Sequence, residues 1–138
     1  MKQIIKLLLI CIIATISATG TANAQSKERR ISREELAVVQ AKHIAGELAL
    51  NDDLTQTFVE TYCNFQKELW ALGPRPGRNG ASGSVSDRLN HSQKILDLRK
   101  KYYARYSEFL TEAQIEKVYE TEHRIMQRLS RKAKQGNK

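Results

Sequence analysis

The stretch from Asn51 to Ala71, NDDLTQTFVETYCNFQKELWA, is the most aromatic and most core-like part of the chain. Asn51 is a good helix N-cap, and two aspartates in the first turn suit the positive end of the helix dipole. The larger side chains then recur at helical spacing in two adjacent rows: Phe58, Tyr62, Phe65 and Leu69 in one, and Val59, Cys63, Gln66 and Trp70 in the other. This pattern predicts a helix that runs from Asn51 to about Ala71.

Another helix is predicted immediately before this one. Ser32 is followed three residues later by Glu35, which is the pattern of a capping box at a helix N-terminus. An apolar stripe at helical spacing then continues as far as Leu50, formed by Leu36, Val39, Ala41, Ile44, Ala45 and Leu48. Asn51 and the two aspartates after it interrupt this helix, so the two helices are expected to be joined by a short turn.

The segment after the aromatic helix cannot be helical. Residues 72–85 contain four Gly and both Pro residues of the chain, Pro74 and Pro76. Glycine and proline in this density predict a flexible loop, which divides the helical part of the chain near its middle.

Two further helices are predicted beyond the loop. The first starts near Ser86 or Asp87, either of which could serve as its cap, and its apolar spacing is carried by Leu89, Ile95, Leu98, Tyr102, Tyr106 and Phe109. The second opens with Leu110-Thr111-Glu112-Ala113-Gln114, where Thr111 and Gln114 form a capping box and Leu110 is placed to pack on Ile115 across the cap. The residues that follow at helical spacing are Ile115, Val118, Glu122, Ile125 and Leu129, with Tyr119 and Met126 alongside.

These elements predict an all-α fold of four helices. Helix, Leu50-Asn51, helix is followed sixty residues later by helix, Leu110-Thr111, helix, which is a weak internal repeat. No segment alternates as a strand does over a useful length. We therefore expect two helical hairpins joined by the Gly/Pro loop, within one domain over residues 25–138 and with frayed ends at 25–31 and 132–138.

The first 24 residues have the three-part pattern of a secretory signal peptide. Lys2 and Lys6 give a basic start, residues 7–16 are almost wholly apolar, and Ala22 and Ala24 supply a small-x-small cleavage pattern. The apolar run is shorter than the ~20 residues that span a bilayer. We therefore expect cleavage after Ala24, export to the periplasm, and no transmembrane segment in the mature protein.

Charge and cysteine content narrow the classes of partner. The chain has a formal net charge of +8, and loss of Lys2 and Lys6 with the signal lowers it by two, to +6. A basic exported protein favours anionic partners such as lipid headgroups, acidic glycans or acidic unfolded chains, although solubility alone is the simpler interpretation. Cys63 is the only cysteine after residue 24, so it is either buried or paired with another chain.

The segment Leu110-Thr111-Glu112-Ala113-Gln114 resembles the LTxxQ motif of the Spy/CpxP-type periplasmic proteins. Those proteins carry two such motifs, each between helices. A degenerate first copy is present here at Leu50-Asn51-Asp52-Asp53-Leu54, with Leu54 in place of the glutamine. The resemblance implies a thin, curved, four-helix homodimer that acts as an ATP-independent chaperone or as an envelope-stress adaptor. It also implies a concave, positively charged face that holds unfolded clients, whereas the long Gly/Pro loop departs from the family pattern.

A chaperone of this kind needs charge for capture and shallow apolar contact for retention. The motif residues Leu50, Asn51, Leu110, Thr111 and Gln114 are expected to be structural, since they cap helices. The residues that could contact clients are basic or aromatic: Arg99, Lys100, Lys101, Arg124 and Arg128, with Phe58, Phe65, Trp70, Tyr102, Tyr103 and Tyr106. The simpler interpretation assigns the aromatic residues to the core and the charges to solvated faces.

Other functional classes have weaker support in the sequence. Glu120 and His123 have the Glu-x-x-His spacing of carboxylate metal sites, but His43, His91 and Cys63 are isolated, so a metal-binding stress sensor is an alternative. A basic protein that binds membrane or glycan surfaces is another. We expect no cofactor and no enzymatic activity, because the sequence has no catalytic constellation and no phosphate-binding loop. Charge alone suggests nucleic acid, and the export signal argues against it.

Overall fold

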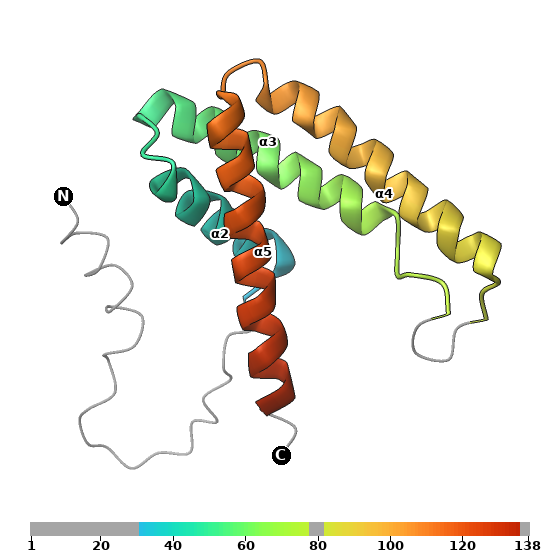
Figure 1. Cartoon of the computed structure of the whole chain (residues 1–138). Coiled ribbons are helices and arrows are strands. Elements are labelled where there is room, and N and C mark those ends of the chain that lie inside the picture. Colours follow the sequence, from blue (N-terminus) through green and yellow to red (C-terminus); the bar gives the residue numbers. More distant parts are fainter. Residues whose placement is uncertain (1–30, 78–81, 136–138) are drawn as a thin grey trace, which may run out of the picture. The chain divides into compact units, whose positions relative to one another are not determined.

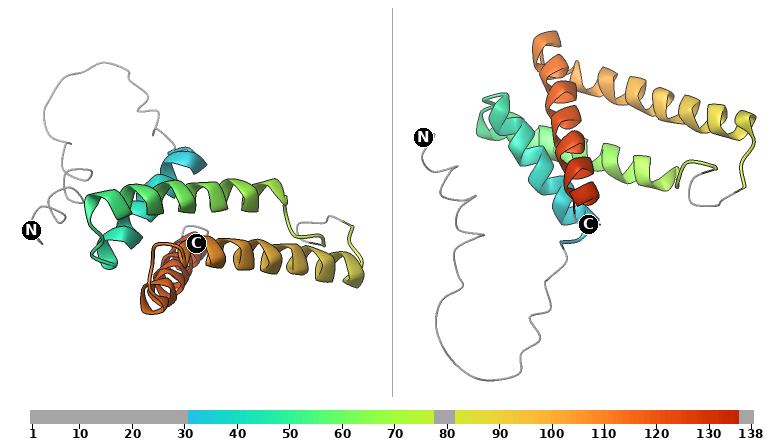
Figure 2. Two further views of the ribbon diagram at one scale, coloured as in Figure 1. Left: turned by 90° about the horizontal axis from the view of Figure 1, so that it is seen from above. Right: turned by 60° about the horizontal axis from the view of Figure 1, so that its bottom comes forward.

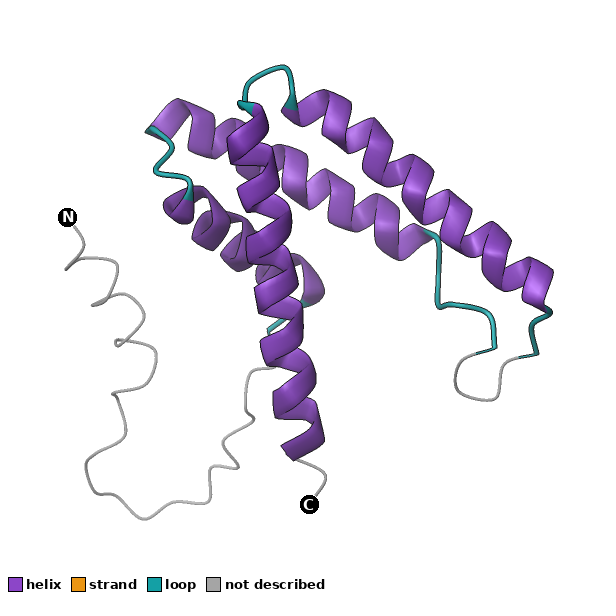
Figure 3. Ribbon diagram, viewed as in Figure 1, coloured by secondary structure: helices purple, strands orange, loops and turns teal. Residues whose placement is uncertain are grey.

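The computed structural model of the chain describes residues 31–77 and 82–135, which form one compact unit. This part contains four α-helices and no β-strand (Figures 1 and 3): α2 (Arg33–Glu47), α3 (Asp52–Ala71), α4 (Val85–Tyr106) and α5 (Glu112–Gln135). None of these four helices is long and apolar enough to cross a membrane. The all-α prediction is confirmed, while the predicted signal peptide, residues 1–24, lies outside the described residues.

The predicted caps of the first two helices are present. The Ser32 hydroxyl accepts a hydrogen bond from the Glu35 backbone N–H (3.1 Å), and the Glu35 carboxylate accepts one from the Ser32 N–H (3.0 Å). The Asn51 side chain accepts a hydrogen bond from the Leu54 N–H (2.9 Å). Each of these bonds satisfies a backbone donor that a helix N-terminus leaves free.

The helix after the loop starts earlier than the sequence predicted. Its N-cap is Ser84 and its first residue is Val85, whereas we expected Ser86 or Asp87 to be the cap. Asp87 instead occupies the third helical position, where its carboxylate accepts a hydrogen bond from the Ser84 N–H (2.9 Å). Hydrogen bonds from the Ser84 hydroxyl (2.8 Å) and from the Ser84 N–H lower the pKa of Asp87. The Ser84–Asp87 spacing is thus a third capping box.

Helix α2 ends three residues before the expected boundary at Leu50. Ala49 has a φ of 53°, in the left-handed region that non-glycine residues seldom adopt. The Ala49 N–H donates to the Gly46 carbonyl (3.1 Å) and the Leu50 N–H donates to the Ala45 carbonyl (3.2 Å). This pair of bonds is a Schellman motif, which reverses the chain between α2 and α3.

The loop between α3 and α4 is non-helical over its described residues, as predicted. Gly73 has a φ of 73° and follows the last turn of α3. A Cβ atom on Gly83 would lie 2.7 Å from the Pro76 Cβ and 2.8 Å from the Gly77 nitrogen. The two ends of the loop therefore touch closely at a position where only glycine fits.

Helix α3 is the central element of the fold. It packs on α2 and on α4, which lies beside it after the loop (Figure 2). The core combines side chains from all four helices, among them Ile44 of α2, Phe58 of α3, Tyr102 of α4 and Val118 of α5. Leu110 and Ile115 both belong to this core, in agreement with the predicted contact across the Thr111 cap.

The two helices of the second half do not form a closed hairpin. From their turn at residues 107–111, α4 and α5 diverge, and α5 packs across α2 (Figure 2). Ala37, Ala41 and Ala45 form a buried row of small side chains on α2, which lets another helix approach closely. The predicted pair of separate hairpins is therefore replaced by an arrangement in which α5 returns to the first hairpin.

Helix α5 is also longer than expected. The sequence predicted frayed residues from Lys132 onward, but the helix continues to Gln135. Lys132 and Lys134 lie in its last turn, where positive charge suits the negative end of the helix dipole. Residues 136–138 lie outside the described part of the chain.

Candidate functional site

Four of the six aromatic residues predicted to contact clients are buried in the core instead. Phe58, Phe65, Tyr102 and Tyr106 are each at most 3% exposed, so none of them offers a surface to a client. Phe58 packs on Tyr106 with ring centroids 5.6 Å apart, and Phe65 meets Tyr102 edge-on at 5.3 Å. The prediction was wrong for these four because α3 and α4 share a single core, and the aromatic rings fill it.

The other two aromatic candidates lie at the surface but have partners. Trp70 is half-buried and the Arg33 guanidinium lies over its ring, 5.2 Å from the centroid. Tyr103 is 41% exposed, and its hydroxyl donates a hydrogen bond to the Glu112 carboxylate (2.7 Å). This bond stabilises the protonated phenol and raises the pKa of Tyr103. Tyr103 is thus the aromatic candidate with the most accessible ring.

Most of the predicted basic residues are already paired. Lys101 contacts Glu68 (2.7 Å), Arg99 contacts Glu122 (3.4 Å), and Arg124 lies 3.8 Å from Glu47. Among the described residues, Lys100 and Arg128 are exposed and have no ion-pair partner. The positive charge available to a partner is therefore smaller than the count of basic residues suggests.

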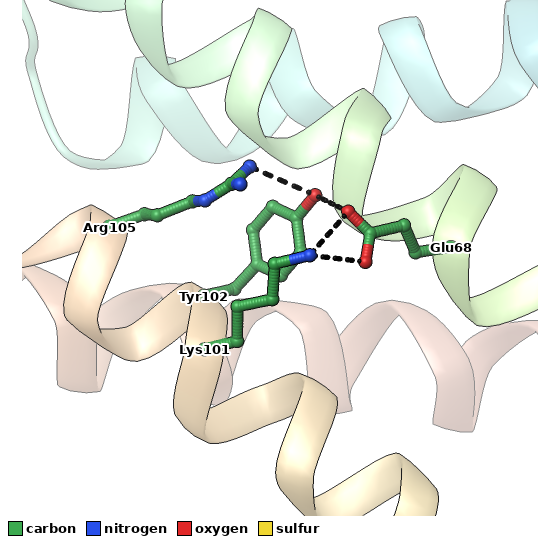
Figure 4. Close-up of polar contacts among 4 residues, drawn as sticks. All are labelled: Glu68, Lys101, Tyr102 and Arg105. Carbon is green, nitrogen blue, oxygen red and sulfur yellow. Dashed lines mark hydrogen bonds and ion pairs between the residues drawn. The ribbon is translucent and has the colours of Figure 1, made fainter.

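A polar cluster joins α3 to α4 at the edge of the aromatic core (Figure 4). The Tyr102 hydroxyl donates to the Glu68 carboxylate (2.7 Å), Lys101 donates to both carboxylate oxygens, and Arg105 donates to the Tyr102 oxygen (3.3 Å). Hydrogen bonds from Lys101 and Tyr102 lower the pKa of Glu68. Burial, reinforced by the bond to Glu68, raises the pKa of Tyr102 to about 12. The cluster therefore keeps an ionised carboxylate beside a neutral phenol and holds the two helices in register.

A second polar contact bridges α4 and α5. The Arg99 guanidinium lies between the rings of Phe65 (5.4 Å) and Tyr119 (5.9 Å) and reaches the Glu122 carboxylate. The adjoining cavity has a volume of ≈ 10 Å³, about the space of one water molecule. The Arg99 contact therefore holds the helices together, and the cavity beside it has no room for a small-molecule ligand.

The outer face of α4 carries an apolar stripe that the sequence interpretation missed. Val85, Leu89, Leu96 and Tyr103, called the α4 stripe below, are 62%, 65%, 46% and 41% exposed. Around the helix they lie about 100–140° from the centre of the row formed by the buried residues Leu98, Tyr102 and Tyr106. Leu89 is one of the residues that carry the predicted helical spacing, and the structure leaves it at the surface. Leu89, Leu96 and Tyr103 recur every seven residues, and this second period was the signal available in the sequence.

The second half of α5 also leaves its apolar side uncovered. Met126 is 58% exposed and Leu129 is 42% exposed. The first half of the same helix is well packed, with Ile115, Val118 and Thr121 buried. The burial of α5 therefore ends about halfway along its length.

The predicted metal alternative gains no geometric support. In the described part of the chain, no three His, Cys, Asp or Glu side chains come together in a way that could hold a metal ion. Glu120 and His123 are both exposed on α5, and the His123 Nε2 atom lies 2.8 Å from the Gln127 amide nitrogen. Cys63 is a half-buried free thiol, and burial raises its pKa, which disfavours the reactive thiolate.

The LTxxQ segment is a helix cap in this structure. The Gln114 side-chain oxygen accepts hydrogen bonds from the Thr111 N–H (2.9 Å) and hydroxyl (3.2 Å), and the Thr111 hydroxyl accepts one from the Gln114 N–H (3.3 Å). At the degenerate first copy, Asn51 caps the Leu54 N–H, but the aliphatic Leu54 side chain cannot return a bond. Both segments therefore act as helix N-caps, one at the start of α3 and the other at the start of α5, as the sequence predicted.

Comparisons of this chain with protein-family models, with curated proteins and with solved structures found no match.

Proposed function

We propose that this chain is an exported, ATP-independent chaperone or stress adaptor of the Spy/CpxP type, which binds proteins and catalyses no reaction. The signal-peptide pattern, the basic mature chain and the LTxxQ segment support the family and a periplasmic location. The single observation that carries the binding function is the α4 stripe, a row of exposed apolar side chains on a surface helix.

The geometry of the stripe suits unfolded chains better than a folded partner. Its four exposed side chains lie along one helix, so many different apolar segments could lie against them. Lys100 lies beside the stripe and is exposed, which provides attraction over a longer range than apolar contact does. Weak, shallow and adaptable contact of this kind is what holding an aggregating client requires.

The proposal includes a homodimer. Residues 89, 96 and 103 have the seven-residue spacing of one seam position in a coiled coil. Pairing of two copies through the α4 stripe would cover the side chains that a client would contact, so the partner copy and the client would compete. Sedimentation velocity over a range of concentrations, with and without an unfolded client, tests this. A chain that stays monomeric at every concentration would remove the dimer from the proposal.

The holdase function is tested by aggregation of a chemically unfolded client without ATP, followed by light scattering. The chain from Gln25 onward should suppress scattering, and the double variant Leu89→Gln, Leu96→Gln should lose most of this activity because both side chains belong to the stripe. The matched control is Leu36→Gln with Val39→Gln, which removes two exposed apolar side chains from α2. Equal activity in all three proteins would refute client binding through the α4 stripe. No suppression of scattering by a several-fold excess of the wild-type chain over the client would refute the chaperone function.

A further inference from the structure

The second half of α5 has a charge pattern unlike that of any other part of the protein. Residues 123–135 contain no Asp or Glu, and their five cations are Arg124, Arg128, Arg131, Lys132 and Lys134. All five are exposed. Only Arg124 has an ion-pair partner among the described residues, and that partner, Glu47, is 3.8 Å away. This half-helix therefore presents charge of one sign, and four of its five cations have no ion-pair partner among the described residues.

The same segment is amphipathic. Ile125, Met126 and Leu129 lie within one arc of the helix, at spacings of three and four residues. Arg124, Arg128 and Lys132 are spaced by four residues and form the neighbouring row. Met126 and Leu129 are largely exposed and Ile125 is half-buried, so the apolar arc is accessible with cations along its edge.

The position of this segment leaves it free to approach a flat surface. Figure 1 shows the last turns of α5 reaching beyond the end of α2, against which its first half packs. A narrow apolar arc of three side chains cannot enclose a partner helix, but it can enter the boundary between headgroups and acyl chains.

We propose that residues 123–135 dock the protein on an anionic phospholipid bilayer, with Met126 and Leu129 entering the interface and the cations contacting lipid phosphates. Charge complementarity favours this occupant. A bilayer with anionic lipids is a diffuse negative surface that attracts every nearby cation without requiring a fixed geometry, and each Lys or Arg strengthens binding about fivefold. The proposal goes beyond the chaperone function and does not depend on it, because it uses α5 and not the α4 stripe.

Vesicle co-sedimentation at low salt tests the proposal. The protein is the chain from Gln25 onward, which keeps the whole core because every core residue lies within residues 31–138. It should bind vesicles that contain phosphatidylglycerol and leave pure phosphatidylcholine vesicles in the supernatant. The variant R128Q/R131Q/K132Q should bind about 100-fold more weakly, and added salt should release the wild-type protein.

Two further variants distinguish docking through α5 from attraction by net charge alone. K42Q/K67Q/K94Q removes the same charge from other exposed positions and should bind like the wild type. M126Q/L129Q leaves the charge unchanged and should weaken binding severalfold. Equal losses in the two charge variants would show a general effect of net charge, and would overturn the proposal. Vesicle binding by M126Q/L129Q equal to that of the wild type would also overturn the proposal. Binding of the wild-type protein to polyglutamate but to neither type of vesicle would overturn it in favour of an acidic protein partner.

Discussion

The Ala49→Gly substitution should stabilise this protein, although replacing alanine by glycine in or beside a helix usually lowers the stability of a protein. Ala49 has a φ of 53°, and its Cβ atom makes this conformation unfavourable by about 1–2 kcal/mol. Glycine removes that strain, and its greater freedom in the unfolded chain offsets about 0.5–1 kcal/mol. The backbone bonds from residues 49 and 50 to Gly46 and Ala45 need no side chain and are kept. We therefore expect a net gain of about 0.5–1 kcal/mol.

Two reciprocal substitutions make this test specific to backbone conformation. Gly73 also has a positive φ, 73°, and a Cβ atom there would meet nothing within 4 Å, so Gly73→Ala should destabilise by about 1 kcal/mol. Gly46 lies inside α2 with equally open surroundings, so Gly46→Ala should stabilise by about 1 kcal/mol. Urea unfolding followed by far-UV circular dichroism measures all three. A loss of stability in Ala49→Gly would refute the strained turn, and with it the Schellman motif as the element that sets the α2–α3 angle.

Two further predictions concern polar contacts of the helices. Gln114→Ala should lower the free energy of unfolding by about 1 kcal/mol, because it removes the acceptor for the Thr111 N–H. In the Gln114→Ala background, Thr111→Ala should then cost less stability than it does in the wild-type protein. Strictly additive losses in urea unfolding would contradict a reciprocal capping box. Glu68 has a lowered pKa in the folded state, so its contribution to stability is present above its ordinary pKa near 4.5 and is lost as the pH falls through the lower folded value. Glu68→Gln should flatten the dependence of stability on pH below 4.5, and an unchanged slope would show that the cluster with Lys101 does not persist in solution.

Local rules were sufficient to predict most helix N-termini from the sequence. The N-caps at Ser32, Asn51 and Thr111 each depend on residues at most three positions apart, so the sequence contains all the information that they need. The Ser84–Asp87 box has the same spacing and was missed because Ser86 and Asp87 are also acceptable caps. The end of α2 was missed for another reason: Ala49 adopts a conformation that its own residue type disfavours, so the sequence gives no local signal for the turn.

The exposure of side chains could not be predicted in the same way. Tyr102 and Tyr103 are adjacent aromatic residues of one helix, yet the first is 1% exposed and the second 41%. A 100° step around α4 separates them, and which of them faces the core depends on where α3 and α5 pack. Leu89 and Leu98 show the same effect at opposite sides of the helix. Sequence periodicity identifies the apolar positions of a helix, but only the tertiary contacts decide which row is covered.

The direction of α5 accounts for both of the exposed apolar surfaces. Had α5 folded back along α4 as a closed hairpin, its second half and the outer side of α4 would have been candidates to cover each other. Helix α5 packs on α2 of the first hairpin instead, and Arg99, held between Phe65 and Tyr119, joins it to α4. The α4 stripe and residues Met126 and Leu129 are consequently left to solvent at separate places. The packing of α5 thus leaves two surfaces with different chemistry: an almost uncharged stripe suited to apolar client segments, and a basic half-helix suited to an anionic bilayer. Because the two surfaces share no residue, separate variants can test them.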